Sequence, residues 1–216
     1  MNCTIIDTGN SRSFPGPHKL LQHAARDGDV VVIVGTGAGA VLDRWRGRTD
    51  KAAIVVELGA ECLGVHTGER RGEEGSNILG FARFRLGEAA PSDLVELVRQ
   101  PRTPEAAVDA ARSVFEGAGL QVAVCGDFAG RIVDRLVRPY YNAALRKLDE
   151  GLATADDMDA TLRMGLGYPE GPIALLERTG LAHHFDVSQA LFEQYGDAAY
   201  APARRARVAK QREGKK

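Results

Sequence analysis

A glycine-rich turn that follows an apolar run is the first feature of this chain that could bind a ligand. Residues Val30–Ala40 read VVVIVGTGAGA, in which Gly35, Gly37 and Ala40 match G-x-G-x-x-A between a predicted strand and a possible helix. In a dinucleotide-binding fold this pattern brings backbone N–H groups and a helix N-terminus against the pyrophosphate. Glu57 ends the next apolar run about 20 residues later, where such folds place an acid on the ribose. The pattern predicts a nucleotide site, although a plain strand-to-helix turn without a ligand would use the same glycines.

Other side chains with reactive groups form no clear pattern in the sequence. The cysteines Cys3, Cys62 and Cys125 are odd in number, and their spacing suits no metal site. We expect reduced, mostly buried thiols, as in a cytoplasmic protein. A thiol enzyme built on Cys62 would need a base that the neighbouring sequence does not supply. His66 lies in a loop rich in glycine and glutamate, and nothing nearby in the sequence predicts what would orient it.

The elements that would position these residues alternate between strand and helix in the first half of the chain. Val30–Val34 is apolar and β-branched throughout, which is typical of a strand covered on both faces. Strands that alternate with helices predict a mainly parallel α/β sheet. The predicted strands are Cys3–Ile6, Val30–Val34, Ala53–Leu58, Ile78–Phe84 and Leu120–Cys125, and the predicted helices are His18–Arg26 and Pro104–Gly117.

The second half of the chain shows helical periodicity alone. Apolar residues recur every three or four positions from Ile132 to Leu148, which predicts one amphipathic helix, bent near Pro139 and ended by Gly151. Further helices are expected after a cap at Thr154, from Pro172 onward, and over Phe185–Tyr195. We therefore expect an α/β domain over 1–125 and a helical domain over 126–216.

The overall composition excludes several classes of function. The chain has 216 residues, of which 44% are hydrophobic and 26% charged, and its net charge of −1 argues against a nucleic-acid-binding surface. The longest apolar run, Val30–Val34, is too short to span a membrane, and MNCTIIDTGN lacks the pattern of a signal peptide. The basic last fourteen residues are expected to form a solvated, partly frayed tail, or else a contact for an acidic ligand.

The stretch from Gly126 to Pro172 resembles the start of the C-terminal helical domain of the 3-hydroxyacyl-CoA dehydrogenase family. Its most specific segment is Gly165-Leu-Gly-Tyr-Pro-Glu-Gly-Pro172, at the end of a dense helical pattern. The resemblance implies a truncated Rossmann-like α/β domain followed by an all-α domain of the 6-phosphogluconate-dehydrogenase-like type. It also implies an oxidoreductase of fatty acid metabolism that uses NAD, an acyl-CoA ligand, and a homodimer formed through the helical domain.

The resemblance also bears on the glycine-rich turn. In the family the nucleotide loop lies within the first residues of a longer N-terminal domain, whereas Gly28–Ile33 here resembles a later strand of that domain. The family's first βαβ unit is then absent or reduced to residues 1–27. This comparison favours a turn without a nucleotide.

The motifs that contain the family's catalytic residues can be matched to positions of this sequence. The general base is a histidine in a Gly-x-His-Phe-Phe-Asn-Pro strand end, and Gly80–Leu86 places Ala82 at that position. The glutamate that holds the histidine corresponds to Glu96 in Leu94–Arg99. The serine loop corresponds to Leu58–Leu63, which has no serine, and the asparagine of Gly-Phe-x-x-Asn-Arg-Leu corresponds to Asp134. Glu96 and Asp134 are therefore the candidate catalytic residues that remain.

Three functions follow as hypotheses. The first is NAD-linked oxidation of a 3-hydroxyacyl-CoA. The second is a non-catalytic dimeric relative that binds an acyl-CoA or a protein partner, and the loss of the histidine and the serine favours it, because Ala82 cannot accept a proton. The third is a different enzyme on the same scaffold, using Cys62, Glu61 or Asp134.

Overall fold

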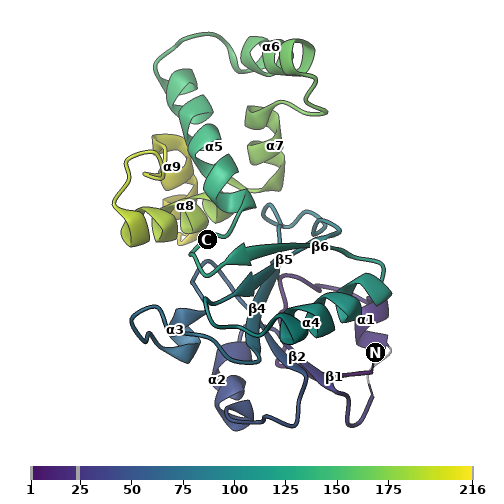
Figure 1. Cartoon of the computed structure of the whole chain (residues 1–216). Coiled ribbons are helices and arrows are strands. Elements are labelled where there is room, and N and C mark those ends of the chain that lie inside the picture. The colour runs from purple at the N-terminus through teal and green to yellow at the C-terminus, as the bar shows by residue number, and fades with distance from the viewer. Residues whose placement is uncertain (1, 23–24, 216) are drawn as a thin grey trace. The chain divides into compact units, whose positions relative to one another are not determined.

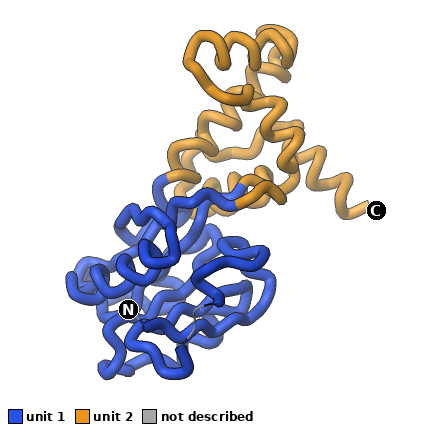
Figure 2. Tube along the Cα trace, turned by 90° about the vertical axis from the view of Figure 1, so that its right-hand side faces the viewer, with its two compact units in different colours: residues 1–85, 91–132 blue, residues 86–90, 133–216 orange. Residues whose placement is uncertain are grey.

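The computed structural model describes residues 2–22 and 25–215. The chain divides into two compact units, one within residues 1–85 and 91–132 and the other within 86–90 and 133–216 (Figure 2). The last strand ends at Gly126, the position of the expected domain boundary, whereas the two units separate between Ile132 and Val133. The turn after the last strand therefore packs with the sheet.

A six-stranded sheet forms the centre of the first unit, and its strands lie side by side in chain order (Figure 1). Four of the neighbouring pairs are parallel, and the β4–β5 pair is antiparallel. This arrangement confirms the predicted, mainly parallel α/β sheet. The strands are β1 (Cys3–Asp7), β2 (Val30–Val34), β3 (Ala53–Glu57), β4 (Ile78–Arg83), β5 (Leu94–Arg99) and β6 (Gln121–Gly126).

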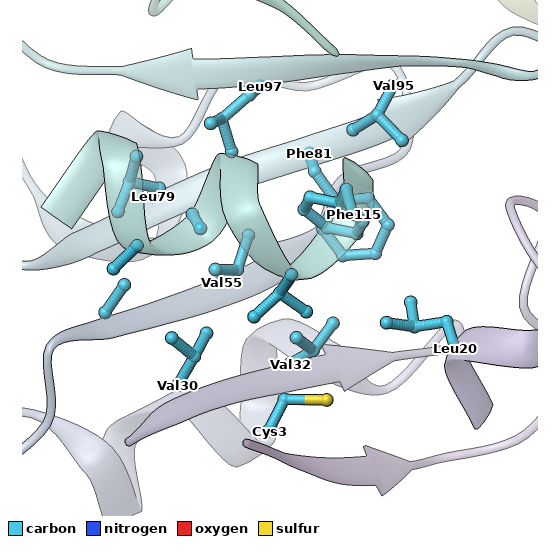
Figure 3. Close-up of a cluster of buried hydrophobic side chains, with 14 of the residues drawn as sticks. Cys3, Leu20, Val30, Val32, Val55, Leu79, Phe81, Val95, Leu97 and Phe115 are labelled. Atoms are coloured by element: carbon cyan, nitrogen blue, oxygen red, sulfur yellow. The ribbon is translucent and has the colours of Figure 1, made fainter. Parts of the chain in front are cut away.

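Helices cover both faces of this sheet, and for that reason β2 and β3 are buried along their whole length. One face packs against α4 (Glu105–Gly117) and α1 (Lys19–Gln22), where Phe81 and Phe115 lie 5.1 Å apart between ring centroids (Figure 3). The other face packs against α2 (Ala38–Leu42), a 3-10 turn (Asp43–Trp45) and α3 (Gly64–Thr67). The two apolar layers fix the strand ends that carry the predicted site residues.

Two predicted helices of this unit differ in length from the observed ones. The helix predicted over Pro104–Gly117 is confirmed as α4, which begins at Glu105. The helix predicted over His18–Arg26 is much shorter in the structure, where α1 covers Lys19–Gln22, and residues 23 and 24 lie outside the described part.

The second unit is helical, as predicted. Its first helix contains Pro139, and the next begins after Thr154, whose hydroxyl accepts a hydrogen bond from the Asp157 amide at 3.1 Å. This cap and the helix that starts at Pro172 confirm the sequence prediction. The helices are α5 (Val133–Asp149), α6 (Ala155–Leu166), α7 (Pro172–Thr179), α8 (Leu181–Tyr195) and α9 (Arg204–Glu213).

The basic C-terminal segment also differs from its prediction. A frayed tail was expected, but Arg204–Glu213 form α9, with Ala206 fully buried. Contacts along the helix explain its order, because Arg205 pairs with Asp149 and Lys210 pairs with Asp186. Of the helices that the structure describes, none has the length and apolar character needed to cross a bilayer.

Candidate functional site

Glu57 lies at the carboxyl end of β3, and its carboxylate is engaged inside the protein. The residue is 8% exposed. One oxygen accepts hydrogen bonds from the Ser11 hydroxyl at 2.7 Å and from the Gly35 amide at 2.6 Å, and the other accepts from the Ser13 amide at 2.7 Å. Three donors from two separate segments thus converge on one buried carboxylate.

The amides of the glycine turn are also bonded within the chain. The Thr36 amide donates to the Gly9 carbonyl at 3.0 Å, and the Gly37 amide donates to the Thr8 hydroxyl at 3.1 Å. The Ala38 amide donates to the Gly35 carbonyl at 3.1 Å. A dinucleotide pyrophosphate would need such amides as free donors, so the arrangement does not fit that group.

Ala40, the last residue of the predicted fingerprint, is exposed on α2. The structure thus gathers Gly35, Gly37 and Glu57 around one turn and leaves Ala40 outside it. The nucleotide site predicted from these residues stays a prediction that the hydrogen bonds do not favour.

The candidate acid–base position lies between β4 and β5. Ala82 is directly opposite Glu96 in the antiparallel pair, and both residues are buried. Side chains of directly opposed residues lie on the same face with Cβ atoms about 4.5–5.5 Å apart. This register is the one that a histidine–glutamate pair would need, so the structure places the two candidate positions together. With alanine there, a methyl group faces the carboxylate and no proton can be transferred.

Glu96 makes contacts that hold the turn after β6. Its carboxylate accepts the Ile132 amide at 2.8 Å, and Arg131 Nε lies 3.8 Å from its second oxygen. Arg131 is itself buried and donates to the carbonyls of Gly59 and Glu61. The guanidinium thereby ties the loop after β3 to the glutamate. Glu96 thus has a structural role in this unit.

The turn that presents Arg131 has an unusual backbone. Gly130 and Arg131 have φ angles of 72° and 50°, and a positive φ is unfavourable for arginine. Such a conformation persists where the surroundings determine it. Here the buried contacts of the Arg131 side chain stabilise it.

Asp134 lies on α5 in the helical unit, within a chain of polar side chains. It accepts a hydrogen bond from Arg138 Nε at 2.7 Å, and Arg138, 1% exposed, is among the largest fully buried side chains. Arg138 Nη1 lies 3.0 Å from His184 Nδ1, and His184 Nε2 lies 2.9 Å from Asn142 Oδ1. Because arginine only donates, Nδ1 is the acceptor and the proton of the neutral ring is on Nε2.

Burial, together with the adjacent Arg138 charge, lowers the pKa of His184 to about 3. The ring is therefore neutral at physiological pH and accepts from the guanidinium without repulsion. This chain of contacts orients Asp134. Arg138 lies four residues further along α5, a spacing that brings the two side chains together, whereas His184 on α8 lies too far along the chain to be predicted by spacing.

A histidine–glutamate contact that the sequence did not predict lies beside the glycine turn. His66 Nε2 is 3.2 Å from Glu61 Oε1, so Glu61 orients the ring. A Cβ at Gly39 would lie 2.4 Å from His66 Nδ1, which places the other ring nitrogen against the α2 backbone. The pair therefore fastens α3 to α2. In the sequence, only the glycine at position 39 indicated that another group approaches the α2 backbone there.

The loop that corresponds to the serine position is held by Asp127. Its carboxylate accepts the amides of Leu63 and Gly64 and a hydrogen bond from Gln100. Cys62, within this loop, is a partly exposed free thiol. Among the described residues, no group of three His, Cys, Asp or Glu side chains could hold a metal ion.

Comparison with known proteins finds relatives that share part of this chain. Residues 130–216 match the model of the 3-hydroxyacyl-CoA dehydrogenase C-terminal domain. The 3-hydroxybutyryl-CoA dehydrogenase of Bradyrhizobium diazoefficiens is 36% identical over 110 residues, which are 51% of this chain and 38% of that protein. The 3-hydroxybutyryl-CoA dehydrogenase of Mycobacterium tuberculosis is 35% identical over 129 residues, 58% of this chain and 43% of that protein. The matches thus span about two fifths of the length of these relatives.

A solved structure extends the comparison to the sheet. Mycobacterium tuberculosis FadB2 aligns with a TM-score of 0.70 and 25% identity, covering 87% of this chain and 67% of that one. The likeness confirms the predicted fold class, a truncated Rossmann-like α/β domain followed by an all-α domain.

Proposed function

We propose that this chain, whose residues 130–216 match the 3-hydroxyacyl-CoA dehydrogenase C-terminal domain, binds an acyl-CoA thioester without oxidising it. The observation that carries the proposal is Ala82 opposite Glu96. Oxidation of a hydroxyl group requires a base for its proton, and a base in that position contributes on the order of 10² to 10⁴ in rate. A methyl group supplies none of it.

The ligand class is inferred from the relatives. Proteins named for 3-hydroxybutyryl-CoA share about a third of their residues with this chain over the aligned region. Residues 130–216 match that family's C-terminal domain and form the helices α5 to α9 here. We therefore propose a short-chain acyl-CoA as the ligand, and a protein partner in its place is an outcome that the test distinguishes.

NAD-linked oxidation is the alternative that family membership supports. It would require both a base in place of Ala82 and a site for the dinucleotide. Glu96 is buried, accepts the Ile132 amide and lies beside the Arg131 guanidinium, and these contacts suit a structural role better than that of a base. These two contacts favour the proposal over the alternative.

Calorimetric titration of the purified chain with acetoacetyl-CoA tests the proposal, with free CoA and butyryl-CoA as comparisons. Saturable binding of the acyl thioesters, with no NADH consumed when NADH is added, supports it. Turnover would establish the dehydrogenase instead. If no thioester binds, the proposed ligand is wrong and a protein partner becomes the better hypothesis.

We also propose that the chain forms a homodimer through its helical unit and works in the cytoplasm. The support is a set of apolar side chains left largely exposed on α5, α6 and the turn between them, namely Leu136, Leu152, Met164 and Leu166. Met164 is 88% exposed, and large exposed apolar surfaces usually mark interfaces.

Sedimentation velocity measures this association directly. We expect a dimer for the wild-type chain and a monomer for Met164→Glu. Val65→Glu is the matched control, because Val65 is an exposed apolar residue of the sheet unit. Equal dissociation in both variants, or a monomeric wild type, would contradict the helical-unit interface.

A further inference from the structure

The protein's own chain requires a glycine at position 35 of the predicted fingerprint and packs closely against Gly37. A Cβ at Gly35 would lie 2.4 Å from the Gly9 carbonyl oxygen and 2.5 Å from the Thr8 hydroxyl. A Cβ at Gly37 would lie 3.3 Å from Thr8 Cβ. In a dinucleotide fold these glycines let the backbone approach the pyrophosphate, whereas here the segment after β1 makes that approach. The motif is thus accounted for without a ligand.

The order of the strands removes a second requirement of a dinucleotide site. Dinucleotides bind where the strand order of a parallel sheet reverses, because the helices on either side diverge there and leave a crevice. The six strands described here follow one another in chain order from β1 to β6, and β1 is an edge strand. The helix after the turn, α2, has only five residues, so few aligned peptide dipoles would attract a phosphate group to its N-terminus.

Glu57 supplies the negative charge that the turn would otherwise receive from a phosphate. Its carboxylate takes the Gly35 amide, the first donor of the turn, together with the hydroxyl of Ser11 and the amide of Ser13. Both serines are buried, so the segment that carries them is packed over the carboxylate. A ribose or a pyrophosphate at this place would have to displace these three bonds.

We infer that Glu57 is a resident anion of the glycine turn and that this chain takes no dinucleotide there. The carboxylate that the sequence pattern assigned to a ribose belongs to the fold instead. The segment after β1 is anchored by it. This inference rests on the turn alone and does not depend on the proposed acyl-CoA ligand.

A titration of the full wild-type chain with NADH, followed by NADH fluorescence, is the first test. We expect no saturable binding up to about 1 mM NADH. Saturable binding at lower concentrations would overturn the inference. Acyl-CoA plays no part in this titration, so its result does not decide the proposed function.

Carboxylate rescue is the second test, and its readout is thermal unfolding. Glu57→Ala leaves three donors around an empty place, so we expect a lower unfolding midpoint that formate raises, relative to chloride at equal ionic strength. Glu61→Ala is the matched control, because the Glu61 side chain is 34% exposed and bonds the nearby Gly59 amide. Formate should not raise its midpoint or that of the wild type.

Either of two outcomes of that test would contradict the inference. One is a Glu57→Ala variant as stable as the wild type, and the other is an equal response to formate in both variants. If the alanine variant does not fold, Glu57→Gln takes its place, because it keeps one acceptor oxygen and removes the charge. It should then unfold at a lower temperature than the wild type, and unchanged stability would overturn the inference.

Discussion

Replacing Arg131 tests whether the buried Glu96 depends on it for charge compensation. Arg131→Met keeps an unbranched side chain and leaves the unfavourable φ unchanged, so the substitution removes the guanidinium from the same backbone. Removing one partner of a buried pair costs about 3–5 kcal/mol. Because Nε and the carboxylate oxygen are 3.8 Å apart, we expect a loss near the low end, about 3 kcal/mol in the free energy of unfolding.

The double variant with Glu96→Gln separates the pair from the other contacts of Arg131. Glutamine keeps an acceptor for the Ile132 amide but carries no charge. Once the carboxylate is neutral, losing the guanidinium should cost less, so we expect the two single losses to exceed the double loss by about 2 kcal/mol. If the sum of the two single losses equals the loss of the double variant to within about 0.5 kcal/mol, Arg131 does not compensate the charge of Glu96.

Urea unfolding followed by tryptophan fluorescence suits this measurement. Trp45 is the only tryptophan of the chain, and it packs against the sheet face that also carries Ile54. Its signal therefore reports the unit that contains the Glu96–Arg131 pair. Arg102→Met is the matched control, because Arg102 pairs with Glu73 at the surface, where such pairs contribute about 0–1 kcal/mol.

Three further predictions concern single side chains. Burial lowers the pKa of His184 to about 3 in the folded state, so the folded protein binds this proton only at a lower pH than the unfolded chain does, whose histidine pKa is about 6.5. The free energy of unfolding should therefore fall as the pH drops from about 6.5 toward 3. Between pH 7 and 5 the loss should be about 2 kcal/mol by urea titration, and an equal slope in His184→Gln would contradict it. Ala82→His should overfill a buried position, lower stability by about 1–3 kcal/mol and create no NADH-producing activity, so any turnover would count against the account. Thr154→Ala should cost about 1 kcal/mol in urea unfolding by removing the α6 cap, and no change would mean that the cap is dispensable.

The helices and strands were largely predictable because their signals are local. The apolar run Val30–Val34, the cap at Thr154 and the proline at 172 each act within a few residues, and each appears in the structure as predicted. The segment Arg204–Glu213 was not predictable, since its order comes from contacts with distant residues such as Asp149 and Asp186.

The contacts of the candidate site were harder to predict from the sequence than the helices and strands, for a physical reason. A glycine pattern reports that something approaches the backbone closely, but it does not say what approaches. At Gly35 the neighbour is Gly9, and at Gly39 it is the His66 ring. The register of Ala82 against Glu96 agrees with the motif comparison, yet the contact of Glu96 with Arg131 depends on a turn whose path only the fold reveals.

We propose that this chain binds an acyl-CoA thioester and does not oxidise a hydroxyl group. The most direct measurement mixes the concentrated protein with NADH and acetoacetyl-CoA and follows NADH absorbance over the time of a single turnover. The absorbance should stay constant while calorimetry shows that the thioester is bound. A loss of NADH that scales with protein concentration would contradict the proposal.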